Sequence, residues 1–264
     1  MIEGNDFQDN LILVFGKPRT AIFSHMDSVG FTVRYENQLV PIGGPEIEEG
    51  LELTGEDSMG PIVCKLKTTG KNHTLFHDFP RAIDRGTSLV FKSKLSIKNK
   101  KITGTYLDNR LGILNALKVA ESLDNGVIVF SSYEEHGGGS VPLLIRYLYE
   151  KYKIKQALIS DITWVTDGVR QGDGVVISMR DHNIPRKKFI DRVLQLANES
   201  QILYQLEVEG SGSSDGREVH HSPYPVDWCF IGAPEDNVHS PKETVDISDF
   251  QAMNDLYIYL MERL

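Results

Sequence analysis

This sequence contains few cysteines, no long apolar runs and no excess of basic residues. Only Cys64 and Cys229 occur, so no disulfide framework can form and a reducing cytoplasm is the expected location. No run approaches the roughly 18 apolar residues of a membrane-spanning helix. The start, MIEGNDFQDN, is too acidic and polar for a signal peptide. The formal net charge is −9, whereas general nucleic-acid binding needs a basic face. We therefore expect neither a membrane nor a nucleic acid as partner.

The remaining composition is that of a folded globular protein. Of the 264 residues, 40% are hydrophobic and 25% are charged, which excludes disorder and fibrous folds. This length suits one large domain, or one domain that carries a smaller insert.

The pattern of the sequence changes between residues 30 and 105. Two apolar strands, expected at 11–15 and 20–24, precede this region. Within it, short alternating runs such as Phe31–Tyr35 and Ser88–Phe91 are separated by Gly and Pro turns. This pattern is typical of small all-β units. We therefore predict that residues 30–105 form an inserted β-rich domain, and that residues 1–29 and 106–264 form one α/β domain.

The second half of the sequence alternates strand and helix patterns. The expected strands are 127–131, 156–160, 175–178, 202–208 and 226–231, and the expected helices are 109–123, 140–151, 185–198 and one that begins with the capping box Ser248-x-x-Gln251. Strands that alternate with helices favour a mostly parallel sheet with helices on both faces. The predicted fold class is therefore α/β with a small inserted all-β domain.

Polar side chains follow the expected strands at the ends where open α/β sheets bind ligands. They are His25 after strand 20–24, Glu134 and Glu135 after strand 127–131, Asp161 after strand 156–160 and His239 after strand 226–231. Asp108 begins a helix, which also fixes its position. Each of these residues alone is more typical of a solvated turn, a surface pair or a helix cap. Their combination at one edge of a sheet favours a shared site.

The candidate ligands are His25, Asp108, Glu135, Asp161 and His239. Two imidazoles and three carboxylates are ligand types that zinc and cobalt accept. Three carboxylates and one hydroxide nearly offset the charge of two divalent ions, so each ion can take one His and one carboxylate while the third carboxylate bridges. Glu134 then suits a general base. Asp27 is placed to bond the other nitrogen of His25 and fix its tautomer.

The order of these motifs resembles that of metallopeptidase family forty-two, the glutamyl aminopeptidase-like or tetrahedral aminopeptidases of the zinc exopeptidase clan. The similar segments are HMD-x-x-G at 25–30, LDNR-x-G at 107–112, EE at 134–135, the single Asp at 161 and VHSP at 238–241. The resemblance extends from about residue 11 to the end. Residues 210–215 only partly resemble the family's Gly-rich segment near the substrate pocket.

The resemblance implies a role for each matching residue. His25 and Asp161 would hold one metal, Glu135 and His239 the other, and Asp108 would bridge both. Glu134 would be the catalytic base, with Asp27 behind His25. Family members remove N-terminal residues from peptides with zinc or cobalt, manganese being a further option here, and assemble through the inserted domain. The resemblance therefore implies two divalent ions per subunit, peptide substrates with a free N-terminus, and a homo-oligomer.

Two other functions remain open from the sequence. The same site would serve a deacylase or a carboxypeptidase-like amidohydrolase, which needs an Arg to anchor a substrate carboxylate, with Arg110, Arg170 and Arg180 as candidates. A non-catalytic assembly protein with a decayed site is disfavoured because all five ligands and the base are retained.

Overall fold

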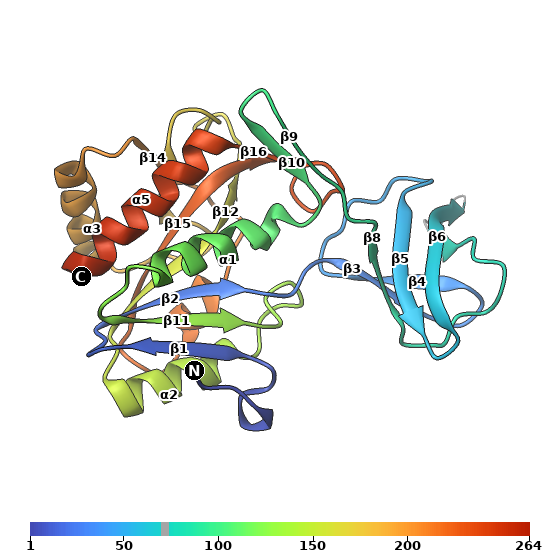
Figure 1. Cartoon of the computed structure of the whole chain (residues 1–264), viewed down its shortest axis with the longest axis horizontal. Helices are drawn as coiled ribbons and strands as arrows, with labels where there is room; N and C mark the ends of the chain where they lie inside the picture. The colour runs from blue at the N-terminus through green and yellow to red at the C-terminus, as the bar shows by residue number, and fades with distance from the viewer. Residues whose placement is uncertain (70–73) are drawn as a thin grey trace.

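The computed structural model describes residues 1–69 and 74–264. Figure 1 shows two parts, a layered part made of helices and strands and a smaller part made of strands. The smaller part is inserted between the second strand of the larger part and its first helix.

The larger part is built on one mixed sheet. Its strands, in spatial order, are β1 (Leu11–Phe15), β11 (Gly126–Ser131), β2 (Thr20–His25), β12 (Gln156–Trp164), β15 (Asp227–Asp236), β16 (Glu243–Asp246), β10 (Lys101–Gly104) and β9 (Leu95–Lys98). β13 (Val175–Arg180) pairs with β15 and also with β14 (Tyr204–Val208). The four strands β11, β2, β12 and β15 are parallel. Every residue of β2 and β11 is buried, as expected for strands covered on both faces.

The prediction of a mostly parallel sheet is correct for these central strands and for the pair β13–β14, but not for the rest of the sheet. β1 joins β11 in antiparallel register, and β13, β16, β10 and β9 are also attached through antiparallel pairs. Antiparallel partners need no crossover helix, so strands from distant parts of the chain can extend the edges. The fold is therefore mixed α/β.

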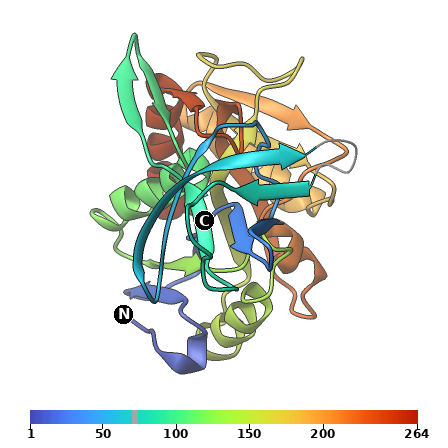
Figure 2. The same ribbon diagram turned by 90° about the vertical axis from the view of Figure 1, so that its right-hand side faces the viewer.

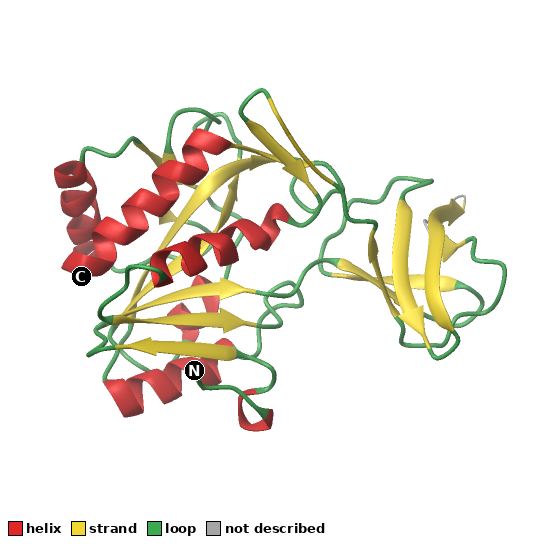
Figure 3. Ribbon diagram, viewed as in Figure 1, coloured by secondary structure: helices red, strands yellow, loops and turns green. Residues whose placement is uncertain are grey.

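Helices cover both faces of this sheet, as predicted (Figure 3). One apolar core holds residues of α1 (Leu107–Ala120), α3 (Lys187–Ser200) and α5 (Ile247–Arg263). The other core holds residues of α2 (Val141–Tyr152) and α4 (Gly216–His221). A short 3-10 helix, Asn5–Phe7, precedes β1. Within the described ranges, no helix is long and apolar enough to cross a membrane.

The smaller part is a closed antiparallel barrel (Figure 2). Its strands are β3 (Gly30–Val33), β4 (Gln38–Ile42), β5 (Glu52–Asp57), β6 (Gly60–Thr69), β7 (Thr74–His77) and β8 (Ser88–Phe91). Side chains along β6 alternate between buried and outward-facing, because successive strand residues point to opposite faces. Phe31, Leu53, Leu66 and Phe91 fill the interior.

The predicted insert of residues 30–105 extends beyond this barrel. β9 and β10 form a hairpin that pairs with β16 of the main sheet, with Lys101 opposite Asp246. By strand pairing, residues 95–104 therefore lie with the main sheet, and the barrel strands span residues 30–91.

Two local predictions also differ from the structure. β12 does not end at Ser160 but continues to Trp164, so Asp161 lies inside a strand. α5 begins two residues earlier than its Ser248 capping box predicts, because Asp246 is the N-cap and its side chain accepts a hydrogen bond from the Ser248 amide.

Candidate metal centre

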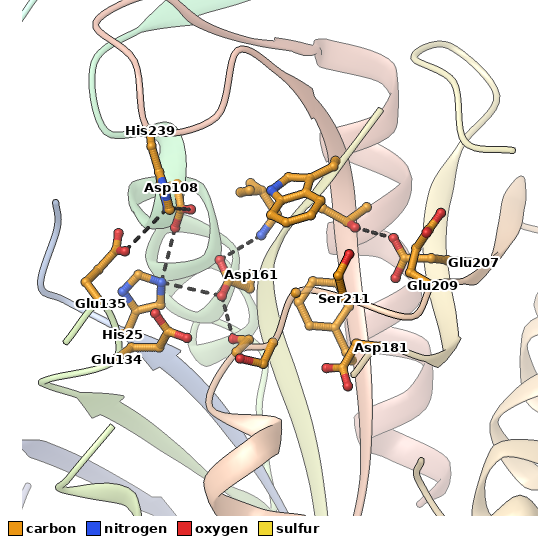
Figure 4. Close-up of a pocket in the computed structure, with 17 residues that line it drawn as sticks. His25, Asp108, Glu134, Glu135, Asp161, Asp181, Glu207, Glu209, Ser211 and His239 are labelled. Carbon is orange, nitrogen blue, oxygen red and sulfur yellow. Dashed lines mark hydrogen bonds and ion pairs between the residues drawn. The ribbon is translucent and has the colours of Figure 1, made fainter. Parts of the chain in front are cut away.

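The carboxyl ends of the central strands bring the predicted site residues to one edge of the sheet. His25 ends β2, Asp161 lies in β12, and Asp108 lies in the first turn of α1. Glu134 and Glu135 follow β11, and His239 lies between β15 and β16. Figure 4 shows these six side chains converging on one region of a cleft.

Asp108 stands between two groups of ligand atoms. Its Oδ1 lies 3.1 Å from His25 Nε2, and its Oδ2 lies 3.4 Å from His239 Nε2. His25 Nε2 is also 3.4 Å from Asp161 Oδ2, and His239 Nε2 is 3.3 Å from Glu135 Oε2. Within each triad, His25–Asp108–Asp161 and Asp108–Glu135–His239, the ligand atoms lie within 4.8 Å of one another. The two triads share one carboxylate.

The unsatisfied oxygens of this cluster fit metal ions. Among the described residues, neither Asp108 Oδ1 nor Glu135 Oε1 has a hydrogen-bond partner, although both atoms are buried. A buried carboxylate oxygen without a partner is costly, and a divalent cation would remove that cost. Imidazole and carboxylate are also ligand types of zinc. The residues present therefore fit two divalent ions that share Asp108.

Backbone carbonyls hold both imidazoles in the orientation that a metal needs. His25 Nδ1 is 3.1 Å from the Asp27 carbonyl oxygen, and His239 Nδ1 is 3.1 Å from that of Gly44. A carbonyl oxygen only accepts hydrogen bonds, so each Nδ1 carries a proton and Nε2 is the nitrogen that would bind a metal.

Asp27 supports the site in a different way from the one predicted. Its carboxylate oxygen is 3.8 Å from His25 Nδ1, and its backbone carbonyl makes the closer contact. The carboxylate instead accepts hydrogen bonds from the amides of Glu134 and Glu135, each at 3.1 Å. Asp27 thus positions the two glutamates as well as the histidine.

Burial raises the pKa values of the two adjacent glutamates of the site. Loss of solvent raises the pKa of Glu134 to about 9, with Asp161 adding to the rise and His25 opposing it. Burial and the charge of Asp108 raise the pKa of Glu135 to about 7. In the metal-free chain Glu134 is therefore protonated at neutral pH. Nearby cations favour the charged form of a carboxylate, so two metal ions would lower this pKa.

The pKa values of both histidines are raised, although burial alone would lower them. Burial lowers the pKa of His239, but the hydrogen bond with Asp108 and the charge of Glu135 outweigh it and raise the pKa to about 9. For His25, Asp161 and Asp108 likewise overcome burial and raise the pKa. Without metal, protons occupy the nitrogens that would bind the ions.

Three acidic residues of the cleft had no prediction from the sequence, whereas Ser214 belongs to the segment 210–215 that partly resembles the family's Gly-rich segment. Ser214 Oγ donates to Asp161 Oδ2 at 2.6 Å. The cleft, of about 630 Å³, is further lined by Asp181, Glu207 and Glu209. Asp181 directly follows β13, so the strand-end pattern applies to it as well. Glu207 lies inside β14 and has no such signal.

None of the three candidate arginines lines the cleft. Arg110 lies over the ring of Tyr106 and donates to Ser93. The Arg180 side chain donates to the carbonyls of Asp181 and Glu209. The described lining of this cleft contains no Lys or Arg, and the adjoining pocket, which shares Glu134, Glu135 and His239 with it, contains Arg217.

Comparison with known proteins identifies the family. A family model described as M42 glutamyl aminopeptidase matches residues 78–256. This chain belongs to the M42 glutamyl aminopeptidase family. The matched range contains Asp108, Glu135, Asp161 and His239, while His25 lies outside it and reaches the same cluster through β2.

Other members of the M42 family and their relatives have the same fold. A curated "Putative aminopeptidase" of Acetivibrio thermocellus is 25% identical over 240 residues, which cover 86% of this chain and 69% of that protein. Aminopeptidase APDkam598 of Desulfurococcus kamchatkensis superposes with a TM-score of 0.87 at 21% identity, covering 97% of this chain and 83% of its own. Pyrococcus horikoshii TET1 peptidase, which can assemble into a tetrahedron or a large octahedral shell, gives 0.83 at 21% identity, with 97% and 88% covered.

Proposed function

We propose that this chain is a two-metal aminopeptidase that removes N-terminal residues from peptides in the cytoplasm. The observation that carries the proposal is the pair of ligand triads that share Asp108 in one cleft. Membership of the M42 family supports it independently.

In this proposal the ligands divide between two ions, with zinc the expected metal and cobalt or manganese as alternatives. His25 and Asp161 hold one ion, Glu135 and His239 hold the other, and Asp108 bridges. The bound ions would supply Lewis acidity that polarises the scissile carbonyl and lowers the pKa of the attacking water. The carbonyls of Asp27 and Gly44 keep both imidazoles aimed at the site.

Glu134 is the proposed general base. It lines the same cleft as the ligands (Figure 4), and Asp27 fixes its backbone amide. Its carboxylate takes a proton from the attacking water and passes it to the leaving nitrogen. In this assignment Glu135, the adjacent residue, holds an ion and is not the base.

The chemistry of the cleft favours a substrate amine over a substrate carboxylate. Both oxygens of Asp161 accept hydrogen bonds, from Ile162 N at 2.8 Å and from Ser214 Oγ at 2.6 Å. Glu135 Oε1 has no hydrogen bond among the described residues, so it is the better candidate to receive the α-ammonium group. A carboxypeptidase would need a basic anchor; the described lining of the cleft contains none, and Arg217 of the adjoining pocket is paired with Glu218 at 3.7 Å.

The test compares free and N-acetylated aminoacyl anilides with the metal-loaded protein. Acetylation removes the positive charge that Glu135 would contact and adds bulk at the closed end of the site. We expect kcat/KM to fall at least about a hundredfold, roughly 2.7 kcal/mol of transition-state stabilisation. Comparable rates on leucine anilide and acetyl-leucine anilide would instead support a deacylase.

A further inference from the structure

The cleft continues from the metal centre to a second group of acidic side chains. Asp181 follows β13, Glu207 lies in β14 and Glu209 follows β14. All three line the same cleft as His25 and His239. Figure 4 shows them on the opposite side of the cleft from the two histidines. We call Asp181, Glu207 and Glu209 the acidic wall.

Two members of the acidic wall are buried and incompletely paired. Asp181 is 8% exposed and Glu207 is 4% exposed. Asp181 Oδ1 accepts from the amide and the side chain of Asn183, at 2.5 and 3.3 Å, while no hydrogen bond reaches its Oδ2 in the described part of the chain. Glu207 Oε1 accepts from the Thr163 hydroxyl. Both residues line the cleft.

The described residues supply no ion-pair partner for this wall. Within residues 1–69 and 74–264, none of its three carboxylates forms an ion pair. The nearest arginine, Arg180, donates its Nε to backbone carbonyls. Burial raises the pKa values of Asp181 and Glu207, since a desolvated carboxylate without a counter-charge is costly. A cationic guest would supply the missing charge.

We propose that the acidic wall binds the side chain of an N-terminal Lys or Arg, so that the enzyme prefers basic N-terminal residues. This inference rests on the proposed aminopeptidase function, which places the first residue of the substrate in this cleft. It specifies a substrate class opposite in charge to the glutamyl residue for which the family is described. A glutamate side chain would meet like charges in the wall and no basic partner in the lining.

The same cleft also suits the aliphatic part of such a side chain. Trp164 and Phe230 line it, and Trp164 is 44% exposed. A Cβ at Gly212 would lie 3.5 Å from the Trp164 ring, so the indole is held against the loop that contains Ser211 and Ser214. Lys and Arg bury their methylene stems along apolar surfaces while the charged end finds a polar partner.

The direct test measures the binding of L-lysine and L-norleucine to the zinc-loaded, full-length protein by calorimetry. The two ligands have side chains of similar length and differ in the terminal ammonium, and neither can be hydrolysed. We expect lysine to bind at least about tenfold more tightly, as charge-assisted contacts to buried carboxylates allow. Equal affinities would overturn the inference.

Substitutions in the acidic wall test whether its carboxylates cause the preference for lysine. Glu207→Gln and Glu209→Gln should each reduce the preference for lysine to less than about threefold, because one charge of the wall is lost. Glu209 is half-buried, so its variant tests the idea even if Glu207→Gln folds poorly. Glu121→Gln removes the same charge at an exposed position outside the cleft and should keep the preference. A preference unchanged in both wall variants would contradict the proposal.

Activity separates this inference from the proposed function. Rates on the anilides of lysine, norleucine and glutamate should fall in that order. If none is hydrolysed while lysine still binds preferentially, the aminopeptidase proposal fails and the binding inference stands. If all are hydrolysed and glutamate or norleucine is preferred, the inference is overturned and the aminopeptidase function stands.

Discussion

Glu134 illustrates how strongly a single residue depends on its surroundings. It lies next to Glu135, and burial raises its pKa to about 9 in the metal-free chain. A general base must be ionised near neutral pH. If Glu134 is the general base, as proposed, bound metal ions would favour its charged form, because nearby cations lower the pKa of a carboxylate.

The first prediction concerns the variant Glu134→Gln. An amide of the same shape cannot take a proton, so kcat should fall by about 10²–10⁴-fold while both ions remain bound. Steady-state rates on an aminoacyl anilide and the metal content per chain check both parts. Glu121→Gln is the matched control and should keep full activity. A near-normal kcat in Glu134→Gln would mean that another residue is the base.

The second prediction concerns pH and metal together. Glu134 and His239 have pKa values raised to about 9 in the folded chain, from ordinary values of 4.5 and 6.5. A group whose pKa is raised by folding stabilises the folded chain fully when the pH is below its ordinary pKa. This stabilisation is lost as the pH rises toward the folded-state value of about 9. Metal ions compete with these protons, so the increase in Tm caused by zinc should be larger at pH 8 than at pH 6.

Asp108→Asn is the control for this pH dependence. It weakens the shared ligand, so zinc should raise its Tm less than that of the unaltered protein at both pH values. A zinc effect on the unaltered protein that is equal at the two pH values, or smaller at pH 8, would contradict the assigned protonation states.

Much of the cluster could be predicted from single residues because strand ends point to one edge of a sheet. His25 and Glu135 were placed together by this argument, and the structure brings them to the same cleft. The two carbonyl contacts to the histidines could not be predicted, because Gly44 lies in a different part of the fold from His239. Glu207 could not be predicted either, since a charged residue inside a strand usually faces solvent.

At the scale of elements, strand patterns identified the central sheet but not its edges. Continuous apolar runs in β2 and β11 indicate burial on both faces. β9 (LSIK) and β10 (KITG) are short and only partly apolar, and only long-range pairing with β16 reveals where they belong. The capping box at Ser248 was misleading because the side chain of Asp246 accepts the hydrogen bond from the Ser248 amide. In a capping box that amide would donate to the side chain of Gln251.

The third prediction concerns the attachment of α5 to the loop before β13. Asp249 is fully buried and accepts hydrogen bonds from the amides of Gly172 and Gly174 at 2.7 and 2.9 Å. Asp249→Ala leaves these buried donors without partners, so the free energy of unfolding should fall by about 1–3 kcal/mol. Urea denaturation measures it. Asp255→Ala, at an exposed position on the same helix, should change it by less than about 0.5 kcal/mol, and equal losses would refute the argument.

At the scale of the whole molecule, the barrel supports both the site and the predicted assembly. Gly44 follows β4 and contacts His239 of the other part. The barrel exposes large apolar side chains, including Val40, Met59 and Val63, which would be available for contacts with another copy of the chain. The role of the insert in oligomerisation remains a prediction.

The fourth prediction is that the protein self-associates through the barrel. Sedimentation at micromolar concentration should give a mass well above the 29.7 kDa of one chain. Val63→Lys places a charge on the outer face of β6 and should shift the distribution toward smaller species. Lys118→Glu, on the exposed side of α1, is a surface control with no expected effect. A species near 29.7 kDa for the unaltered protein would rule out this assembly.

The fifth prediction tests the central claim, that five side chains form one site for two ions. Metal-free protein is titrated with zinc, and the bound metal per chain is measured by elemental analysis after dialysis. We expect two ions per chain. We also expect Asp108→Asn to bind zinc much more weakly, because this carboxylate belongs to both triads. Saturation at fewer than one ion per chain, with zinc, cobalt and manganese each tried, would contradict the two-metal site.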